Sequence, residues 1–290
     1  MKNILSINKL SIELGIPRTV LESVATKKSK YYRPYTKTEM KEDGSIKERR
    51  IDNPNKPIRS IQKKINKNIL KPKCTELPKY MTGCIPGRSA RDNARPHKAS
   101  EAILSVDITN CFPSINASKV YHVFKTEFGC SPPVAKLLTK LTVYGNRLPQ
   151  GAPTSPSLCN LVLQPLADEL YEFSKNKGLN FTQYVDDLTF SGSGFALKKN
   201  KAHILKTVTK HGFEVNERKL KLSRGYQRME VTGLVVNKFV SVGRVYIRNV
   251  ERDILRGANM AKIKGKISHI RATSKSKASK LEGKLRQKSR

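Results

Sequence analysis

Apolar residues near the N-terminus are spaced as in short helices. The stretches 4–14 and 20–24 repeat isoleucine, leucine or valine at helical intervals on either side of a Gly-Ile-Pro break at 15–17. From 58 to 69, isoleucine recurs every three or four positions among lysines and a glutamine. We therefore expect two short N-terminal helices and, after them, an amphipathic helix with a basic outer face.

Strand patterns occupy the regions between these helices and in the middle of the chain. Residues 46–51 alternate after a turn-forming segment at 41–45 and stop before Pro54 and Pro57, which predicts a basic hairpin. The stretch 102–107 is almost continuously apolar, and 181–191 reads as two short strands about an Asp-Asp turn.

A helix over 157–173 is predicted between these two strand regions. Pro165 falls inside it and is expected to kink or shorten it, because proline lacks a backbone donor. Ser155 is placed to cap this helix, with Pro156 at its first position. The alternation of strands and helices predicts an α/β core (α+β) with antiparallel pairing.

The C-terminal segment is basic. Residues 244–290 hold fifteen lysines and arginines against Glu251, Asp253 and Glu282, and end in Ser/Lys-rich sequence. We expect a helical basic appendage with a mobile tail.

Charge narrows the class of partner. The chain has 57 Lys and Arg against 23 Asp and Glu, a net charge of +34 at pH 7, and such a field concentrates polyanions. No stretch reaches the ~18 apolar residues of a membrane-spanning helix, and the N-terminus lacks the apolar core of a secretory signal. Nucleic acid is therefore the expected partner, without a membrane, in the cytoplasm.

Two further classes of site are excluded by motif. The five cysteines form no Cys-x-x-Cys pair, so they fit neither a disulfide framework nor a zinc site and are expected to be reduced packing residues. No Gly-rich phosphate loop is present, which excludes a P-loop ATPase.

Three aspartates are the candidate metal ligands. Asp186 and Asp187 occupy a tight turn whose backbone conformation Asn-Gly or Asp-Gly adopts more readily. Adjacent carboxylates repel each other unless a cation such as Mg²⁺ lies between them. An isolated Asp-Asp pair is also common in solvated turns. Asp107 ends a buried strand and needs a donor, a basic partner or a metal. Together the three can hold two ions about 3.5–4 Å apart, the arrangement of nucleotidyl transfer.

Ordered motifs around these aspartates resemble the palm of reverse transcriptases. They are Asp107 with Phe112 five residues on, Pro-Gln-Gly-x-x-x-Ser-Pro at 149–156, and Tyr-Val-Asp-Asp at 184–187. Asn-Ala-x-x-His at 93–97 and Val-Thr-Gly at 231–233 are similar to signatures of bacterial retron enzymes. The fingers pattern Arg49-x-Ile51-x-x-Pro54 extends the resemblance over about 10–235.

The resemblance implies a right-hand polymerase fold. N-terminal helices and fingers would occupy 1–100, a palm with an antiparallel sheet packed on helices 101–235, and a small basic helical thumb and tail 236–290. No fused nuclease, protease or RNase H domain fits in this length.

The resemblance also assigns roles around the nucleotide. Asp107, Asp186 and Asp187 would bind two Mg²⁺ ions, and Phe112 would act as the steric gate against a ribonucleotide 2′-hydroxyl. Gln150 and Gly151 would lie under the templating base and the incoming nucleotide. Lysine and arginine side chains would grip the triphosphate, the candidates being Lys47, Arg49 and Arg88. Lys219 would protonate pyrophosphate, with Arg218 and Lys221 as competitors.

RNA contacts are expected at two places. His97 has a structural or RNA-positioning role, with Asn93 as its companion, and the residues alone leave both roles open. The basic thumb would follow phosphates and 2′-hydroxyls of a hybrid or RNA hairpin. Its candidate RNA-binding residues are Arg244, Arg248, Lys262, Lys264, Lys266 and Arg271.

By resemblance, the chain copies part of a cognate structured noncoding RNA (msr-msd type) from deoxynucleoside triphosphates. Priming from an internal guanosine 2′-hydroxyl would give branched, RNA-linked DNA (msDNA), in an antiphage defence system with a separate effector protein.

Alternatives are a group II intron-type or a diversity-generating reverse transcriptase, or a catalytically idle RNA-binding protein. The short chain and Val-Thr-Gly argue against the first, and Gln150 with Ser155-Pro156 against the second. The three aspartates argue against the idle protein.

Overall fold

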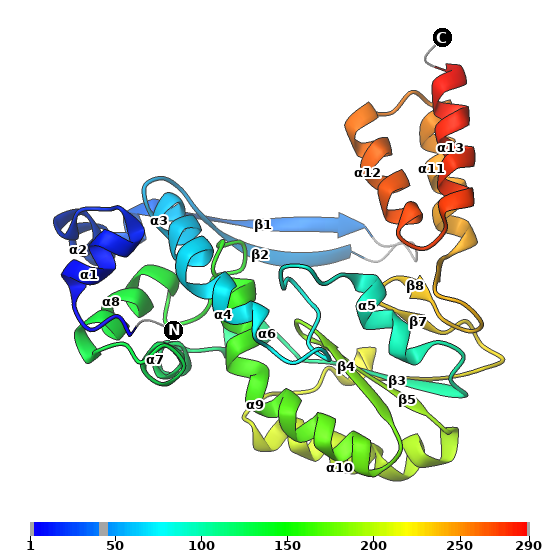
Figure 1. Ribbon diagram of the computed structural model, residues 1–290, viewed down its shortest axis with the longest axis horizontal. Helices are drawn as coiled ribbons and strands as arrows, with labels where there is room; N and C mark the ends of the chain where they lie inside the picture. Colours follow the sequence, from blue (N-terminus) through cyan, green and yellow to red (C-terminus); the bar gives the residue numbers. More distant parts are fainter. Residues whose placement is uncertain (1–2, 41–45, 289–290) are drawn as a thin grey trace.

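The computed structural model describes residues 3–40 and 46–288, in which two hydrophobic cores are built around three antiparallel sheets. Figure 1 shows the arrangement, with a long hairpin above the central sheet and a helical bundle at the C-terminus. The strands are β1 (Tyr32–Met40), β2 (Ile46–Pro54), β3 (Ala102–Asp107), β4 (Asn180–Tyr184), β5 (Asp187–Gly192), β6 (Lys221–Arg224), β7 (Glu230–Val231), β8 (Leu234–Val235) and β9 (Ser241–Val242).

The central sheet has the strand order β4-β5-β3-β6, all antiparallel. The sheet is covered on both faces, by α9 (Ser155–Asn176) and α10 (Gly194–Lys210) on one side and by α5 (Ala90–Ala94) with its following 3₁₀ turn (Arg95–His97) on the other (Figure 1). Its inner strand β3 is therefore buried. This explains its continuous apolar pattern. The predicted antiparallel α/β core is confirmed.

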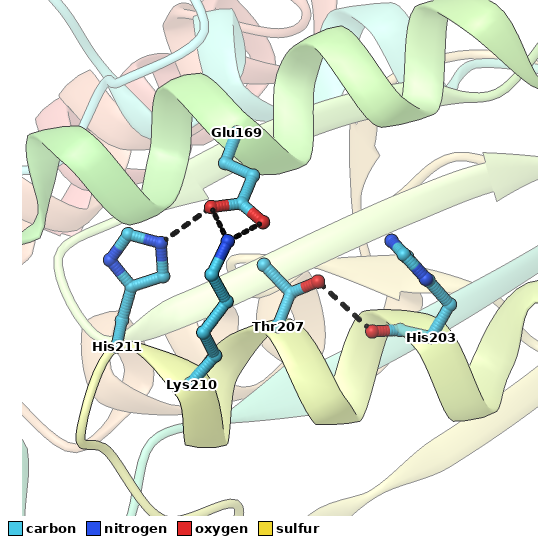
Figure 2. A network of polar contacts seen from close by, with 5 residues as sticks. All are labelled: Glu169, His203, Thr207, Lys210 and His211. Carbon is cyan, nitrogen blue, oxygen red and sulfur yellow. Dashed lines mark hydrogen bonds and ion pairs between the residues drawn. The ribbon is translucent and has the colours of Figure 1, made fainter.

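Polar contacts join the two helices under this sheet. Glu169 of α9 accepts hydrogen bonds from Lys210 Nζ at 2.9 and 3.1 Å and lies 2.8 Å from His211 Nε2 (Figure 2). These partners, His211 first, lower the pKa of the Glu169 carboxyl. One turn or more away, His203 stacks on Phe173 at 4.1 Å. The packing of α9 against α10 is thus stabilised by polar contacts at the surface as well as by buried apolar residues.

The N-terminal region confirms the predicted helices and hairpin. α1 (Ile7–Leu14) and α2 (Arg18–Thr26) pack against α8 (Pro132–Thr142), and β1 pairs with β2 over nine residues; the expected turn at 41–45 lies outside the described residues. The predicted amphipathic helix is α3 (Ile58–Ile65), which continues through a π-helical segment (Asn66–Leu70) into α4 (Lys71–Thr75). The remaining short elements of this half are a 3₁₀ turn (Lys28–Tyr31), α6 (Cys111–Ser114) and α7 (Ala117–Thr126).

The C-terminal region packs around the second hydrophobic core. β7, β8 and β9 form a small sheet, followed by α11 (Arg244–Leu255), α12 (Met260–Arg271) and α13 (Lys275–Lys288). Ala94 of α5 and Ile103 of β3 are buried in the same core, so it is shared with the central sheet. The tail expected to be mobile is helical through Lys288, because Ala278, Leu281 and Leu285 recur at helical spacing and are buried.

Two local expectations about α9, a cap at Ser155 and a shortening at Pro165, were wrong. Ser155 is the first helical residue rather than the cap, and its hydroxyl donates to the Pro149 carbonyl at 2.7 Å. Pro165 does not shorten the helix, which runs for 22 residues with buried leucines on both sides of the proline. Tertiary packing here outweighs the loss of one backbone donor.

The cysteines are free among the described residues, and four are buried as expected. Cys84 differs, because it is exposed in a loop with a positive φ of 57°.

Candidate active site

The central sheet brings the three aspartates together at one end. Asp107, the last residue of β3, is the register partner of Asp187, the first residue of β5. Asp186 lies in the two-residue turn between Tyr184 and Asp187, and its carbonyl accepts a hydrogen bond from Ile108 N at 3.1 Å. Residues far apart in sequence thus meet at one sheet edge because β3 and β5 are neighbours.

The turn that carries Asp186 is held in an unusual backbone conformation. Val185 has φ +58°, which is uncommon for a β-branched residue. Its carbonyl accepts a hydrogen bond from Gln183 Nε2 at 2.8 Å. Beneath it, a Cβ added to Gly83 would lie 2.5 Å from Val185 N, so only glycine permits this close approach. The surroundings therefore impose the turn that local preference would avoid.

The aspartates face a cleft of about 700 Å³ between β2, the palm strands and the Pro-Gln-Gly loop. Three of the six expected nucleotide-binding residues line it as well, and Gly151 is not among the lining residues. The lining includes Arg49, Phe112, Gln150 and Lys219 from the expected set, and Glu48, Arg50, Asp52, Asn110, Arg147 and Asn216 besides.

The electrostatics of this cleft favour a bound cation. Reduced hydration, then the charges of Asp186 and Asp107, raise the pKa of Asp187 to about 6. Burial, then the charge of Asp107, raises the pKa of Asp186, while Lys219 and Arg49 act in the opposite direction. Two carboxylates that resist ionisation side by side are the ligand set that Mg²⁺ stabilises.

Lys219 contacts the third carboxylate directly. Its Nζ donates to Asp107 Oδ1 at 2.5 Å, and Asn216 N donates to the Asp107 carbonyl at 2.8 Å. Of the three candidates for this position, Lys219 lines the cleft, whereas Arg218 and Lys221 are not among its lining residues. Within the described part of the chain, no three acidic, His or Cys side chains converge into a closed metal site. The Lys219 ammonium neutralises Asp107 in this arrangement.

The Pro-Gln-Gly loop is attached to the fingers hairpin. The Gln150 carbonyl accepts a hydrogen bond from Asp52 N at 2.8 Å. Gly151 has φ +114°, and a Cβ there would lie 3.0 Å from Ile51 Cγ2. Glycine is required at this position both for its backbone angle and for its contact with β2.

Asp52 was not predicted from sequence and is the best-buried charge of the cleft. Its side chain is 3% exposed and pairs with Arg50 at 3.1 Å and with Arg147 at 3.5 Å. The only sequence signals were its place within Arg49-x-Ile51-x-x-Pro54 and the position of Arg147 three residues before Gln150. Neither signal indicates that the two segments meet.

Not every predicted residue reaches the cleft. Arg88 is absent from its lining, and its guanidinium donates to the carbonyls of Thr75, Leu77, Pro78 and Met81. This set of acceptors gives Arg88 the role of folding its own loop. The side chain of Lys47 lies outside the described residues.

Asn93 and His97 are fully buried, so the expectation that they bind RNA is wrong for their side chains. His97 Nε2 lies 2.7 Å from Thr182 Oγ1, and its Nδ1 lies 2.8 Å from Ser191 Oγ. Burial lowers the pKa of His97 to about 4. Of the two roles left open, the geometry supports the structural one.

The thumb candidates lie on α11 and α12. Lys266 pairs with Asp253 at 2.5 Å, and Arg271 pairs with Glu282, so part of their charge is neutralised within the bundle. The other four are exposed, namely Arg244, Arg248, Lys262 and Lys264.

Comparison with known proteins agrees with this geometry. Residues 39–236 match the family model described as reverse transcriptase (RNA-dependent DNA polymerase). The chain belongs to the reverse transcriptase family. Within that family, the resemblance to retron enzymes is confirmed by its curated relatives.

Two of these relatives cover most of the chain. Retron Se72 reverse transcriptase of Salmonella heidelberg is 31% identical over 84% of this chain and 66% of its own length. Retron Ec86 reverse transcriptase of Escherichia coli is 32% identical over 77% of this chain and 69% of its own. The chain thus spans about two thirds of these relatives. Retron Mx65 reverse transcriptase of Myxococcus xanthus is 35% identical, over 56% of this chain and 42% of its own length.

Solved structures support the fold. Telomerase from Candida albicans, solved with a fragment of telomeric RNA, superposes with a TM-score of 0.52 at 11% identity, covering 91% of this chain and 61% of that one. Apo telomerase from Candida tropicalis gives 0.51 at 15% identity, covering 79% and 61%. At such identities the likeness concerns the right-hand polymerase fold. No helix in the described part of the chain is long and apolar enough to cross a membrane.

Proposed function

We propose that this chain is a retron RNA-directed DNA polymerase that copies part of a structured noncoding RNA into single-stranded DNA. The observation that carries the proposal is the pairing of Asp107 with Asp187 beside Asp186, in a cleft that also holds Phe112 and Gln150. Membership of the reverse transcriptase family and the likeness to retron enzymes support it.

The proposed division of labour follows the order of the chain. Residues 1–100 act as N-terminal helices and fingers, 101–235 as the palm, and 236–290 as the thumb. Arg49 lines the cleft from β2 and binds the triphosphate. Phe112 lines it from α6 and excludes a 2′-hydroxyl. Gln150 lines the cleft and, with Gly151 next to it in the loop, positions the template base and nucleotide.

Asp107, Asp186 and Asp187 are the proposed ligands of two Mg²⁺ ions. When bound, the ions activate the attacking hydroxyl and stabilise the leaving pyrophosphate. Lys219, which pairs with Asp107 and lines the cleft, is the proposed donor of the proton to pyrophosphate.

The remaining parts of the proposal rest on the likeness to retron enzymes. The partners are a cognate noncoding RNA, its DNA product, deoxynucleoside triphosphates and a separate effector protein. Priming uses an internal guanosine 2′-hydroxyl and gives branched msDNA, in cytoplasmic antiphage defence. Exposed Arg244, Arg248, Lys262 and Lys264 bind the RNA backbone.

The test is to express the chain with its native flanking DNA and to extract nucleic acid from the purified protein. The extract is treated separately with DNase, RNase and a debranching enzyme, with Asp186→Asn/Asp187→Asn as the control. A short DNA whose RNA link yields only to debranching, absent in the double variant, is the expected result. Unbranched DNA would move the protein to another reverse transcriptase lineage. Bound RNA without DNA in either sample would contradict polymerase function.

A further inference from the structure

Three large aromatic side chains are exposed at the end of the palm sheet opposite the aspartates. Phe195 is 77% exposed, Tyr226 82% and Phe239 72%. A single exposed aromatic residue needs no explanation, but three in neighbouring segments, one at the start of α10 and two in loops, form a candidate contact surface. We call Phe195, Tyr226 and Phe239 the aromatic patch.

The strand register places two of the rings on either side of β3. Ala102 at the start of β3 is the partner of Gly192 in β5 and of Arg224 in β6. Phe195 follows Gly192 by three residues, and Tyr226 follows Arg224 by two. Because strands are spaced by ~4.8 Å, the ends of β5 and β6 are about 10 Å apart.

Glu101 forms hydrogen bonds with both of the segments that carry these rings. Its carboxylate accepts a hydrogen bond from Gly194 N at 3.0 Å, and its carbonyl accepts one from Gly225 N at 2.7 Å. The residues that precede Phe195 and Tyr226 are thereby held by one residue. The rings are exposed on supported backbone.

The loop of Phe239 joins the same segment. Ala99 N donates to the Val236 carbonyl at 2.9 Å, and Asn237 Nδ2 donates to the Gly225 carbonyl at 3.1 Å. Lys98 Nζ lies 5.7 Å from the centre of the Phe239 ring. The segments that carry the three rings therefore all contact residues 98–101. In Figure 1 this is the side of the palm where α10 begins and β7 and β8 lie, away from α1 and α2.

The charge around the aromatic patch is positive. Exposed cations lie within three residues of each ring in the sequence or, for Lys98, over a ring, whereas the carboxylate of Glu101 accepts a hydrogen bond from a backbone N–H. These cations are Lys98, Lys198, Arg224 and Lys238.

Exposed rings among cations are the features of surfaces that bind single-stranded nucleic acid, since bases stack on the rings and phosphates meet the cations. A duplex offers phosphates but no free base faces to such rings. We propose that the aromatic patch is a second nucleic-acid site, which binds a single-stranded segment by stacking. Five residue steps along β3 separate it from Asp107, about 17 Å. It deepens the proposed function by adding a site for unpaired flanks of the template or product.

The test uses 12-nucleotide oligomers containing 5-iodouridine or 5-iodo-deoxyuridine, irradiated with the full chain and mapped by mass spectrometry. Moderately high salt suppresses phosphate binding and leaves stacking. We expect crosslinks at Phe195, Tyr226 or Phe239, and the RNA and DNA arms identify which strand is preferred. Crosslinks confined to other surfaces would overturn the proposal.

A binding measurement by anisotropy accompanies the crosslinking. Phe195→Leu/Tyr226→Leu/Phe239→Leu should bind the oligomers about tenfold more weakly, and Ile12→Ala, an exposed apolar residue on α1, should bind as the wild type does. Equal binding by the triple variant would refute the proposal, and Tyr226→Leu alone serves if the triple variant does not fold. Extension of a DNA primer on homopolymer RNA should be unchanged. If the wild type did not extend the primer at all, the proposed function would be contradicted. The crosslinks would still test the aromatic patch.

Discussion

Asn93 Nδ2 donates a hydrogen bond to Thr232 Oγ1 at 3.1 Å, which joins the Asn-Ala-x-x-His and Val-Thr-Gly signatures across 139 residues of chain. The Asn93 carbonyl oxygen of the side chain accepts from Thr82 Oγ1 at 2.8 Å, and Thr82 also contacts Gln183 of the strand before the aspartate turn. Thr232 has φ +48°, so its unusual backbone presents the hydroxyl to Asn93. The two signatures are thus joined by one hydrogen-bonded network next to β4 of the central sheet.

Asn93→Ala should destabilise the fold. The change leaves Thr82 and Thr232 without their side-chain partner, and an unsatisfied buried group costs about 1–3 kcal/mol. Urea unfolding measures the loss, and Asn200→Ala, which removes an amide bond to the Ala196 carbonyl within α10, is the control. An equal loss of unfolding free energy in the two variants would show that the hydrogen bonds of Asn93 stabilise the fold no more than that of Asn200.

Gly83→Ala should impair catalysis. Its new Cβ would lie 2.5 Å from Val185 N and 2.8 Å from the Tyr184 carbonyl carbon, both backbone atoms, so the aspartate turn must shift. We expect kcat for primer extension to fall tenfold or more, which corresponds to about 1.4 kcal/mol in the barrier. Gly283→Ala, whose added Cβ has no neighbour within 4 Å, should leave kcat unchanged. Wild-type kcat in Gly83→Ala would mean that the turn does not depend on this approach.

Asp52→Asn should raise KM for nucleotide more than it lowers kcat. The buried carboxylate pairs with Arg50 and Arg147, which both line the cleft, so the substitution removes the charge that holds these two cations. The backbone hydrogen bond from Asp52 N to the Gln150 carbonyl is kept. We expect KM to rise about tenfold, or ~1.4 kcal/mol of binding. Steady-state kinetics measure the split, with Glu22→Gln as the control because its pair with Arg18 is exposed. A pure loss of kcat would assign Asp52 to the chemical step instead.

Much of this site was predictable because its motifs are local. Asp107, Asp186 and Asp187 end or join strands whose patterns are readable, and the helix and strand types around them follow from spacing. Asp52 was not predictable, since its importance depends on Arg147, 95 residues away, and on a loop contact. The burial of His97 was equally hidden, because no local pattern shows that Thr182 and Ser191 from two strands provide its partners.

The fold should lose stability on the acid side through His97. Its pKa is about 4 in the folded chain against 6.5 for a solvent-exposed histidine, so the unfolded chain binds more protons between these pH values and stability falls as pH falls through that window. The contribution of His97 to the free energy of unfolding that is lost reaches about 3 kcal/mol once the pH is below its folded pKa. The unfolding free energies of wild type and His97→Gln should therefore converge from pH 7 to 4.5. A constant difference would show that His97 does not titrate on unfolding.

The aspartate turn should trade stability for metal binding. The pKa of Asp187 is raised to about 6 and that of Asp186 is raised too, so the unfolded chain releases these protons at lower pH than the folded chain does. Without metal, stability therefore falls as pH rises from about 4 to 6, the opposite sign to His97. Asp186→Asn/Asp187→Asn removes the repulsion and should raise Tm in EDTA at pH 7 by roughly 2–4 °C, about 1 kcal/mol after allowing for solvent screening.

With Mg²⁺ present, the wild type should have a higher Tm than Asp186→Asn/Asp187→Asn. The ion stabilises the wild type because it binds the folded carboxylates, whereas the double variant lacks the charge to hold it. Scanning calorimetry in EDTA and in Mg²⁺ measures both shifts, and Lys210→Gln, which removes a cation from the remote Glu169 pair, is the control. If Mg²⁺ raised Tm equally in the wild type and the double variant, the ion would bind elsewhere. Loss of DNA synthesis together with a higher Tm in EDTA is the expected outcome, because charges placed for catalysis repel one another until the metal is present.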